Sequence, residues 1–380
     1  MKNIKAPQLN SIMDLVNKRE GHIHVLIGPR QVGKTTTVKQ LSEKSRLSSK
    51  YISADGEISR PKSWLSLQWQ MALGEGVELL IIDEIQKVEN WAEEAKKFWD
   101  QREENSPRLI LLGSSSLSLH RGLSESLTGR YILHRIYHWD FESSQELLNE
   151  FDLKKYLEYG GYPGSYEFIE NKFEWLSYIK DSIITPVIEK DILSMVHVKS
   201  PALFRQSFDL ICSYASQEIS YTKLLGQLQD KGNTDLVKNY IKLFEAAFLI
   251  KSLEKYSGKI IKKRSSSPKL YPLAPALYSQ AIDMQFDEEY YGHAFELFIL
   301  MELLKFPGCV YYWRERDYEV DFILEIGNKL IAIEVKYTSL PESTKGLEEF
   351  VTKFKNVVPL IINKDNYKTK LKLISDLIFS

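Results

Sequence analysis

The 380-residue sequence predicts an α/β protein with a parallel sheet and flanking helices in its N-terminal part, a helical middle region and a second α/β unit at its C-terminal end. Three observations predict this fold class. Short apolar runs alternate with helical segments up to about residue 140, helical patterns dominate from about 150 to 250, and apolar runs return after Pro307. Strands separated by helical segments imply a parallel sheet with helices on both faces.

The N-terminal sheet is predicted from its apolar runs. His22–Ile27 is short, apolar and ends at Gly28, as a buried parallel strand does. Leu79–Ile82 and Leu109–Leu112 are similar runs, and they predict two further buried strands. The remaining strands are expected at residues 50–53 and 131–133.

A phosphate-binding loop follows the first predicted strand. Residues 28–35 read Gly-Pro-Arg-Gln-Val-Gly-Lys-Thr and match the P-loop pattern in full, before a helix expected to start at Gly33. Glycines let backbone N–H groups surround phosphate oxygens, and the helix N-terminus adds partial positive charge. Lys34 is expected to reach the β- and γ-phosphates of ATP, and the Thr35 hydroxyl to bind Mg²⁺. The predicted nucleotide-binding residues are Gly28, Pro29, Arg30, Gln31, Val32, Gly33, Lys34, Thr35 and Thr36.

An acidic pair ends the strand Leu79–Ile82. Asp83 and Glu84 are thereby delivered to the carboxyl edge of the sheet, where ligands bind in such folds. Asp83 is expected to hold Mg²⁺ through water, and Glu84 to polarise the attacking water. The pair therefore predicts a hydrolase and not only a nucleotide binder.

Three further residues are candidates with two interpretations each. Ser114 either senses the γ-phosphate or caps a helix after the strand. Arg130 either acts as an arginine finger across a protomer boundary or ends a surface loop. Arg30, inside the P-loop, contacts either the nucleotide or a neighbouring domain.

Residues 20–140 resemble the AAA-type ATPases among the P-loop NTPases. The resemblance rests on the P-loop, Ile-Ile-Asp-Glu-Ile-Gln, Leu-Gly-Ser-Ser-Ser and Leu-Thr-Gly-Arg, in that order. The whole chain resembles a prokaryotic group that fuses this ATPase to a nuclease-like domain, with Tyr-Gly-Gly-Tyr-Pro and Glu-Lys-Asp-Ile (189–192) as further matches. One departure is His138-Trp139-Asp140-Phe141, where that group has a Pro-Leu-Ser-Phe-like segment.

The middle region has the outline of a winged helix-turn-helix. Helices are expected at Leu203–Tyr214, Tyr221–Gln229 and Thr234–Phe244, followed by a basic hairpin. Residues 251–270 carry seven Lys or Arg side chains against one acidic residue, Glu254. Such a wing would follow DNA phosphates with little sequence preference, although a solvated basic hairpin has the same composition. The basic residues are Lys251, Lys255, Lys259, Lys262, Lys263, Arg264 and Lys269.

The C-terminal region is predicted from a helix and a set of strands. Asp287–Leu304 is expected to be an amphipathic helix, and Gly327-Asn328 a tight hairpin turn between two strands. The strands are expected at residues 310–313, 320–326, 330–335 and 357–362, with a helix at 345–353.

Acidic residues of these elements form a second candidate metal site. Asp321 and Glu334 lie on neighbouring strands and could hold a divalent cation, with Glu296 as a further carboxylate. Lys336 faces the same side as Glu334 and would orient or deprotonate water. The order of helix Glu, strand Asp and Glu-x-Lys resembles the PD-(D/E)xK nucleases, which implies a restriction-endonuclease-like fold. Three interpretations stay open: an active nuclease, a nuclease fold without cleavage, and a solvated strand edge. Trp313, Arg314 and Arg316 fit either nucleic-acid backbone binding or an ordinary strand end.

Four domains are therefore expected: an AAA-type ATPase domain at 1–145, a helical connector at 146–200, a winged helix-turn-helix at 201–278 and a nuclease-like domain at 279–380. The net charge of -1 favours no particular class of partner, and any basic surface must be local. Cys212 and Cys309 are far apart, so neither a zinc site nor a disulfide framework is expected. With no signal peptide or apolar stretch of about 18 residues, the sequence predicts a cytoplasmic protein without a membrane span, and the family resemblance implies a prokaryotic one.

Three functions compete. The first is an ATP-driven protein that acts on DNA, the second a nucleotide-controlled switch for a protein partner, and the third a metal-dependent DNase gated by ATP. Assembly into a homo-oligomer is compatible with all three.

Overall fold

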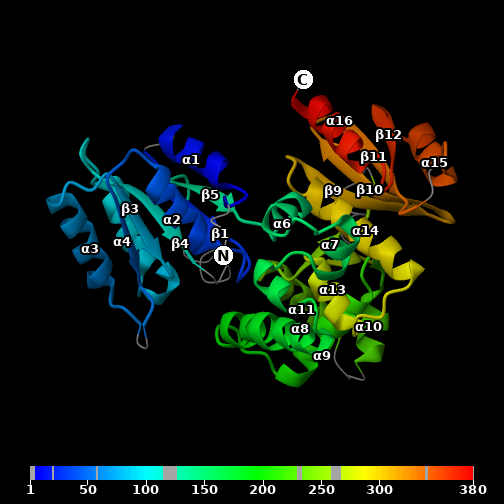
Figure 1. The fold of residues 1–380 in the computed structure, drawn as a ribbon, viewed down its shortest axis with the longest axis horizontal. Helices are drawn as coiled ribbons and strands as arrows, with labels where there is room; N and C mark the ends of the chain where they lie inside the picture. The colour runs from blue at the N-terminus through cyan, green and yellow to red at the C-terminus, as the bar shows by residue number, and fades with distance from the viewer. Residues whose placement is uncertain are drawn as a thin grey trace. The chain divides into compact units, whose positions relative to one another are not determined.

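The computed structural model of the protein describes residues 5–18, 21–56, 59–113, 126–228, 233–257, 267–338 and 341–379, which form two compact units (Figure 1). Unit 1 comprises Met1–Glu150, Tyr162–Gly164 and Asp181–His197. Unit 2 comprises Phe151–Gly161, Ser165–Lys180 and Val198–Ser380.

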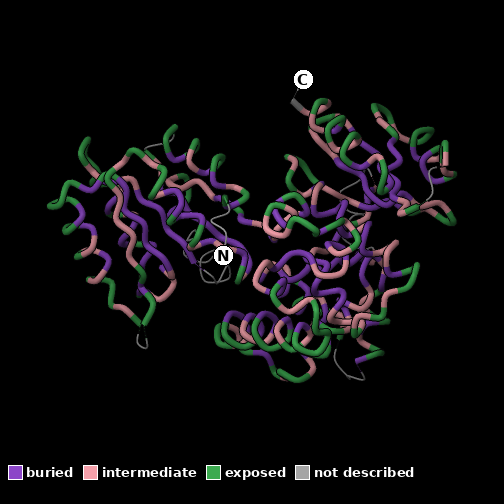
Figure 2. Tube along the Cα trace, viewed as in Figure 1, coloured by how far each residue is buried: buried purple, intermediate pink, exposed green. Residues whose placement is uncertain are grey.

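Unit 1 is built on a five-stranded sheet with the order β2-β3-β4-β1-β5, in which every neighbouring pair is parallel. All five residues of β1 and of β3 are buried (Figure 2). This burial explains why four of the five residues in each strand are apolar. The strands are β1 (Ile23–Ile27), β2 (Ser49–Ser53), β3 (Leu79–Asp83), β4 (Arg108–Leu112) and β5 (Tyr131–Arg135). The predicted parallel sheet is confirmed.

Helices flank this sheet. Helix α1 packs on α2, and α3 packs on α4 through the stacked rings of Trp69 and Phe98, whose centroids are 4.7 Å apart. Because parallel crossovers are right-handed, the connection from β1 to β2 and the connections back through β3 to β4 place their helices on opposite faces. The helices of unit 1 are α1 (Leu9–Lys18), α2 (Lys34–Lys44), α3 (Lys62–Gly74), α4 (Trp91–Asp100) and α6 (Phe141–Leu147), with a 3₁₀ turn at Ile85–Lys87 and a π-helical segment, η4, at Val187–Leu193.

The first part of unit 2 combines helices with a three-stranded antiparallel sheet of order β6-β8-β7. Five of its helices begin at polar side chains that accept a hydrogen bond from the first turn, namely Asp152, Asn171, Ser200, Ser220 and Asn233. The elements are α7 (Leu153–Tyr159), α8 (Lys172–Ser177), α9 (Pro201–Ser213), β6 (Gln217–Glu218), α10 (Tyr221–Gln227), α11 (Thr234–Ala246), β7 (Ile250–Leu253), β8 (Lys269–Pro272) and α13 (Pro275–Ala281). The tip of the predicted basic wing, residues 258–266, lies outside the described residues.

The second part of unit 2 is a four-stranded mixed sheet of order β12-β11-β10-β9. β10 and β11 form the predicted hairpin, and Gly327 has the positive φ of 59° that such a turn requires. The elements are α14 (Glu288–Leu303), β9 (Cys309–Glu315), β10 (Tyr318–Ile326), β11 (Lys329–Val335), α15 (Lys345–Lys353), β12 (Val357–Ile362) and α16 (Tyr367–Phe379).

Helix α14 corrects one expectation. Its N-cap Asp287 and its length agree with the sequence, but the helix is not amphipathic along its C-terminal half. The five consecutive residues Leu297–Met301 are all buried, so this part of the helix is surrounded by apolar neighbours on every side.

The two sheets of unit 2 are joined by backbone hydrogen bonds. The N–H of Tyr256, just after β7, donates to the carbonyl of Tyr312 on β9 at 2.7 Å, and the N–H of Tyr312 donates to the carbonyl of Glu254 at 3.2 Å. The Tyr256 ring also belongs to the apolar core of the second sheet, with Trp313 and Phe350. The segments predicted as winged helix and as nuclease-like domain therefore share one compact unit. Within the described ranges, no helix has the length and apolar character needed to cross a membrane.

Candidate nucleotide-binding site

The P-loop lies at the carboxyl edge of the unit 1 sheet, between β1 and α2. The nine residues predicted to bind nucleotide, 28–36, form this loop and the first turn of α2. A side chain at Gly28 would place its Cβ 2.4 Å from the carbonyl oxygen of Ile136, so the chain passes too close for any other residue. Gly33 has a φ of 86°, and as the N-cap it brings no side chain to the first N–H groups of α2. These N–H groups are thus available to an anion.

Lys34 extends back over the loop. Its Nζ donates to the carbonyl oxygens of Gly28 at 3.0 Å and Pro29 at 2.6 Å. Burial lowers the pKa of Lys34 to about 8, although the nearby carboxylates of Glu84 and Asp83 act in the opposite direction. A phosphate that bound this ammonium would replace carbonyl acceptors with a charged one, which favours the protonated lysine.

Asp83, the last residue of β3, meets Thr35 in the first turn of α2. The Thr35 hydroxyl donates to Oδ2 of Asp83 at 2.8 Å, and the hydroxyl of Tyr51 on β2 donates to the same oxygen at 2.8 Å. The other oxygen, Oδ1, accepts the backbone N–H of Glu84 at 2.9 Å. A hydroxyl and a carboxylate side by side are hard oxygen donors of the kind that Mg²⁺ prefers, so the residues present fit the predicted ion.

Glu84 follows in an unusual backbone conformation. Its φ of 53° is in the left-handed region, which is uncommon for a residue with a long side chain. The side-chain amide of Gln86 donates to its Oε2. The conformation turns the chain sharply after β3 and keeps Glu84 beside Asp83 at the sheet edge; strained residues of this kind concentrate at functional sites.

Arg30 forms a bidentate ion pair within unit 1. Its Nε and Nη2 donate to the two carboxylate oxygens of Asp191 on η4 at 2.5 and 2.6 Å. These hydrogen bonds raise the pKa of Arg30, while partial burial opposes the rise. The sequence predicts that Arg30 contacts either the nucleotide or a neighbouring domain. In the structure Arg30 contacts Asp191, which lies in the range predicted as the helical connector but belongs to unit 1.

The segment 138–141, which differs in sequence from the related prokaryotic group, also contacts the P-loop. The indole N–H of Trp139 donates to the carbonyl oxygen of Val32 at 3.1 Å, which holds the P-loop from the side of β5. The neighbouring His138 forms a hydrogen bond with the Tyr162 hydroxyl at 3.0 Å, and burial lowers the pKa of His138 to about 3, with Lys34 adding to the effect. The segment 138–141 therefore lies beside the candidate site in unit 1.

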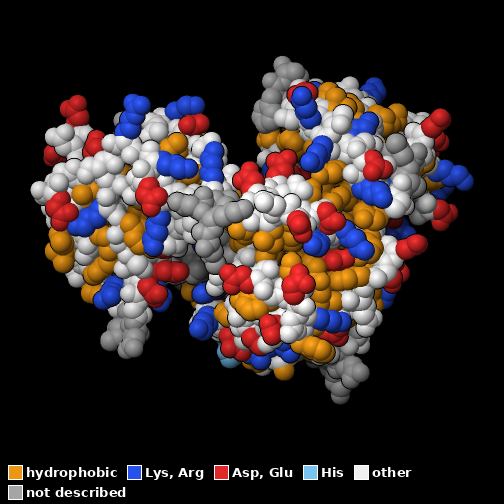
Figure 3. Space-filling view, in the orientation of Figure 1, with side chains coloured by type: hydrophobic (Ala, Val, Ile, Leu, Met, Phe, Trp, Pro, Cys, Tyr) orange, Lys and Arg blue, Asp and Glu red, His pale blue; other side chains and the backbone are white. Residues whose placement is uncertain are grey.

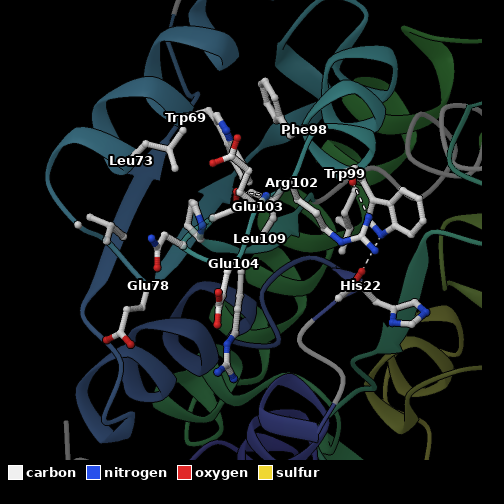
Figure 4. A pocket seen from close by; sticks show the side chains of 18 residues that line it. His22, Trp69, Leu73, Glu78, Phe98, Trp99, Arg102, Glu103, Glu104 and Leu109 are labelled. Carbon is white, nitrogen blue, oxygen red and sulfur yellow. Dashed lines mark hydrogen bonds between the residues drawn. The ribbon is translucent and has the colours of Figure 1, made fainter.

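Arg130 lies at the opposite edge of the sheet. It precedes β5, whose first residue pairs with Ile23, whereas the P-loop follows the end of β1. Its Nε is 3.1 Å from Oδ1 of Asp100, and its guanidinium lies 5.1 Å from the ring centroid of Trp99. Arg102 stacks on the same indole at 3.9 Å, beside a cavity of about 860 Å³ (Figure 4). Within one chain, Arg130 does not reach the P-loop; Ser114 lies outside the described residues.

Sequence reasoning missed three contacts of this site. Tyr51 was assigned only to a strand, Trp139 only to a departing segment, and Asp191 only to the matching Glu-Lys-Asp-Ile segment. The last two could have been suspected, because both lie in motifs that the sequence singles out. The position of Tyr51 follows from the neighbouring placement of β2 and β3, which no local pattern reveals.

The second candidate site converges in unit 2. Glu296, Asp321, Glu334 and Lys336 line one cavity of about 550 Å³, as predicted from the strand and helix positions. A further lysine, Lys269 on β8, lies among the carboxylates and is 3% exposed. This corrects its assignment to a phosphate-contacting wing. Trp313 is 2% exposed and packs in the apolar core, so of its two interpretations the structure favours an ordinary strand residue over a nucleic-acid contact.

Comparisons with known proteins agree with the geometry of unit 1. A family model described as "AAA domain" matches residues 20–144. Two others, described as "Domain of unknown function (DUF8612)" and "Domain of unknown function (DUF4143)", match residues 150–288 and 291–378. Residues 20–144 therefore form an AAA-type P-loop ATPase domain.

Relatives over most of the chain have no assigned activity. Uncharacterized proteins of Mycobacterium bovis and Mycobacterium tuberculosis are each 28% identical over 333 residues, which is 85% of this chain and 72% of theirs. Among solved structures, the RuvB Holliday junction branch migration motor of Thermotoga maritima overlaps with a TM-score of 0.34 at 15% identity, covering 65% of this chain and 89% of that one. The Orc1 protein of Aeropyrum pernix in complex with DNA overlaps with a TM-score of 0.32 at 10% identity, covering 73% of this chain and 93% of that one.

Proposed function

We propose that the AAA-type domain binds ATP with Mg²⁺ and hydrolyses it, and that the nucleotide controls what the rest of the chain does with DNA. The observation that carries the proposal is the convergence of the Lys34 ammonium, the Thr35 hydroxyl and the Asp83 carboxylate beside a loop that only glycine can form at position 28. A triphosphate needs this combination of backbone donors, one cation and a metal-binding edge.

The residues then divide the work as follows. Lys34 and the first N–H groups of α2 bind phosphate oxygens, and Thr35 with Asp83 holds Mg²⁺, which neutralises phosphate charge when bound. Glu84 orients the attacking water and accepts its proton. Tyr51 keeps the Asp83 carboxylate directed at Thr35, since both hydroxyls share Oδ2.

The test is the Lys34→Ala variant. We expect its ATP turnover to fall to background, because the ammonium that binds the phosphates is lost while the fold is kept. Lys44→Ala is the matched control, since Lys44 is exposed at the other end of the same helix, α2, and should leave turnover unchanged. Full turnover by Lys34→Ala would overturn the proposal.

The proposed DNA role is supported by the composition of residues 251–270 and by the helices that precede them. The order α9, β6, α10, α11, β7, β8 gives three helices and a small antiparallel sheet with the basic segment between its last two strands. On the face of unit 1 drawn in Figure 3, by contrast, basic and acidic side chains are interspersed. We therefore propose the segment 258–266 as the part that contacts DNA phosphates.

A quadruple variant tests this role. Replacing Lys259, Lys262, Lys263 and Arg264 with Ser should weaken binding to double-stranded DNA and flatten its dependence on salt, because fewer counterions are released. ATP turnover without DNA should stay unchanged. The same affinity and salt slope in both proteins would exclude this segment as the DNA contact.

A second candidate function is a nucleotide-controlled switch for a protein partner, and the buried Lys269 favours it. An ammonium among the carboxylates of unit 2 counts against the third candidate, an ATP-gated DNase. Plasmid cleavage with Mg²⁺ or Mn²⁺ separates these functions: we expect none from the wild type or from Asp321→Ala. DNA-stimulated ATP turnover would then support the DNA role, and its absence the protein switch. We further propose a cytoplasmic location and assembly into a homo-oligomer.

A further inference from the structure

The acidic cavity of unit 2 holds a buried lysine. Lys269 belongs to β8, the central strand of the three-stranded sheet, whereas the carboxylates around it come from α14 and from β10 of the other sheet. Its Nζ is 2.8 Å from Oε1 of Glu296, 3.0 Å from Oε1 of Glu319 and 3.3 Å from Oδ1 of Asp321. One ammonium thus contacts three carboxylates that approach from two elements.

These carboxylates are fixed in place by other donors. The Tyr271 hydroxyl donates to Glu296 at 2.6 Å, and the backbone N–H of Val335 donates to Oδ2 of Asp321 at 2.9 Å. Asp321 also lies at a β-bulge, where the pairing of β10 with β9 shifts between Val320 and Ile323. Donors other than Lys269 therefore also hold Glu296 and Asp321 in position.

Opposite charges surround Lys269, because three carboxylates lie within 3.3 Å of its Nζ. A charged group that is 3% exposed is tolerated only where opposite charges surround it. The lysine and the carboxylates are thus mutually dependent.

The sequence predicts a divalent cation here, but the residues present do not fit one while Lys269 is there. The Lys269 ammonium lies between Glu296 and Asp321, where a cation would bind. Nζ of Lys336 pairs with Oε1 of Glu334 at 2.8 Å. Oε2 of Glu334 is buried and has no hydrogen-bond partner, although it lines the same cavity. Within the described part of the chain, no group of three or more His, Cys, Asp or Glu side chains has the geometry to hold a metal ion.

We propose that the Lys269 ammonium is the resident cation of this cavity, standing where a divalent cation would bind. Unit 2 is therefore closed to metal-dependent cleavage, and the same ammonium joins its two sheets. Removing the charge leaves Glu296, Asp321 and the unsatisfied oxygen of Glu334 without a counter-charge, and we expect these hard oxygen ligands to rearrange around a divalent cation.

The test measures Mn²⁺ binding by calorimetry, without nucleotide, in full-length chains that carry Asp83→Asn to remove the cation affinity of unit 1. In this background, we expect no Mn²⁺ bound at the cavity. Adding Lys269→Met should create one site per chain with at least tenfold tighter binding than the background, and adding Asp321→Asn to that variant should remove it. Lys251→Met is the matched control, since Lys251 lies half-buried on the neighbouring strand β7 and pairs with Glu245.

Two results would overturn the proposal. One is Mn²⁺ binding in the background chain that Asp321→Asn abolishes while Lys269 is intact. The other is a Lys269→Met chain with native circular dichroism and no added site. Should Lys269→Met fail to fold, the comparison of Asp321→Asn with the background still decides, because the proposal requires both to bind Mn²⁺ equally weakly.

Discussion

At the scale of single residues, Asp83 is the position on which the ATP site depends most. Its two carboxylate oxygens accept hydrogen bonds from the Thr35 and Tyr51 hydroxyls and from the Glu84 backbone N–H, so one side chain orients two others and the chain after β3. Asp83 is 6% exposed, and a carboxylate at that depth is stabilised by these donors. The chemistry of the site is thus set by a small hydrogen-bonded group and not by isolated residues.

Tyr51 gives the first prediction. Burial and the hydrogen bond to Asp83 raise the pKa of Tyr51, so its hydroxyl stays a donor. Tyr51→Phe removes that donor, and we expect ATP turnover to fall about tenfold, since a hydrogen bond to a charged group contributes roughly 1.5 kcal/mol. ATP affinity without Mg²⁺ should not change, because Tyr51 does not contact the P-loop amides.

Steady-state kinetics of Tyr51→Phe beside Tyr131→Phe checks this. Tyr131 starts β5 at the opposite edge of the same sheet, so its loss should leave turnover unchanged. Equal effects of the two substitutions would show that Tyr51 supports the sheet and does not position Asp83.

Lys34 gives a prediction on pH. Because its pKa is lowered to about 8, the side chain is charged below that pH and loses its proton progressively above it. Only the charged form attracts phosphate, so Mg·ATP affinity should be highest below about pH 8 and fall by up to tenfold per pH unit above it. Calorimetric titrations between pH 7 and pH 10 measure this directly. An affinity that stays constant over that range contradicts the assignment of Lys34 as the phosphate ligand.

At the scale of elements, the P-loop is held to η4 by Arg30 and Asp191, which are 161 positions apart in the sequence. Their side chains are 30% and 8% exposed, so this pair is better shielded from water than ordinary surface pairs. The contact couples the loop that binds phosphate to a π-helical segment of unit 1. Short π-helical segments are rare and are often found at functional sites.

A double-mutant cycle measures this coupling. With Arg30→Ala, Asp191→Ala and the double variant, we expect the free energies of urea unfolding to give a coupling energy of about 1–3 kcal/mol. The control cycle uses Lys50 and Glu75, an exposed pair at 2.7 Å, for which less than about 1 kcal/mol is expected. A coupling for Arg30 and Asp191 no larger than the control value would make their contact a minor one.

The same scale shows what the sequence could and could not predict. Helix α15 and strand β12 begin and end where the pattern places them, because caps and apolar runs are local signals. The P-loop residues and Asp83 were predicted from local signals too, and their role in binding nucleotide stays a prediction. The position of Lys269 could not be predicted, because the composition of residues 251–270 fits a basic wing and the acidic partners of Lys269 come from other elements. Likewise, nothing local distinguishes a stacked core Trp313 from one that binds a ligand.

At the scale of the whole molecule, the chain folds into two compact units that differ in architecture. Unit 1 has a wholly parallel sheet with the proposed ATP site at its carboxyl edge, and unit 2 has two smaller sheets that are joined to each other. The division of the C-terminal part into connector, winged helix and nuclease-like domain stays a prediction. Tyr256 and Lys269 each contact both sheets of unit 2, and these contacts join the two sheets into one compact body.

Arg130 gives the prediction that belongs to this scale. It lies at the amino edge of the sheet, so the length of β1, roughly 16 Å, separates it from the P-loop of its own chain. Arg130→Ala should therefore leave Mg·ATP affinity unchanged and should lower turnover only at protein concentrations where copies assemble. Turnover per chain over a dilution series measures this.

Arg102→Ala is the control for Arg130, since both guanidinium groups lie on Trp99. If Arg130→Ala lowers turnover equally at every concentration and Arg102→Ala does the same, the arginines support the fold of unit 1. Weaker Mg·ATP binding by Arg130→Ala in dilute solution would contradict the placement of Arg130 away from the site.

The most direct measurement is calorimetric titration of the full chain with ATP, with and without Mg²⁺, for the wild type, Lys34→Ala and Asp83→Asn. The account predicts one site per wild-type chain, no detectable binding by Lys34→Ala, and a Mg²⁺ enhancement that disappears in Asp83→Asn. Wild-type chains that take up no Mg·ATP, or that bind it as tightly without Lys34, would contradict the claim that the carboxyl edge of unit 1 is a nucleotide site.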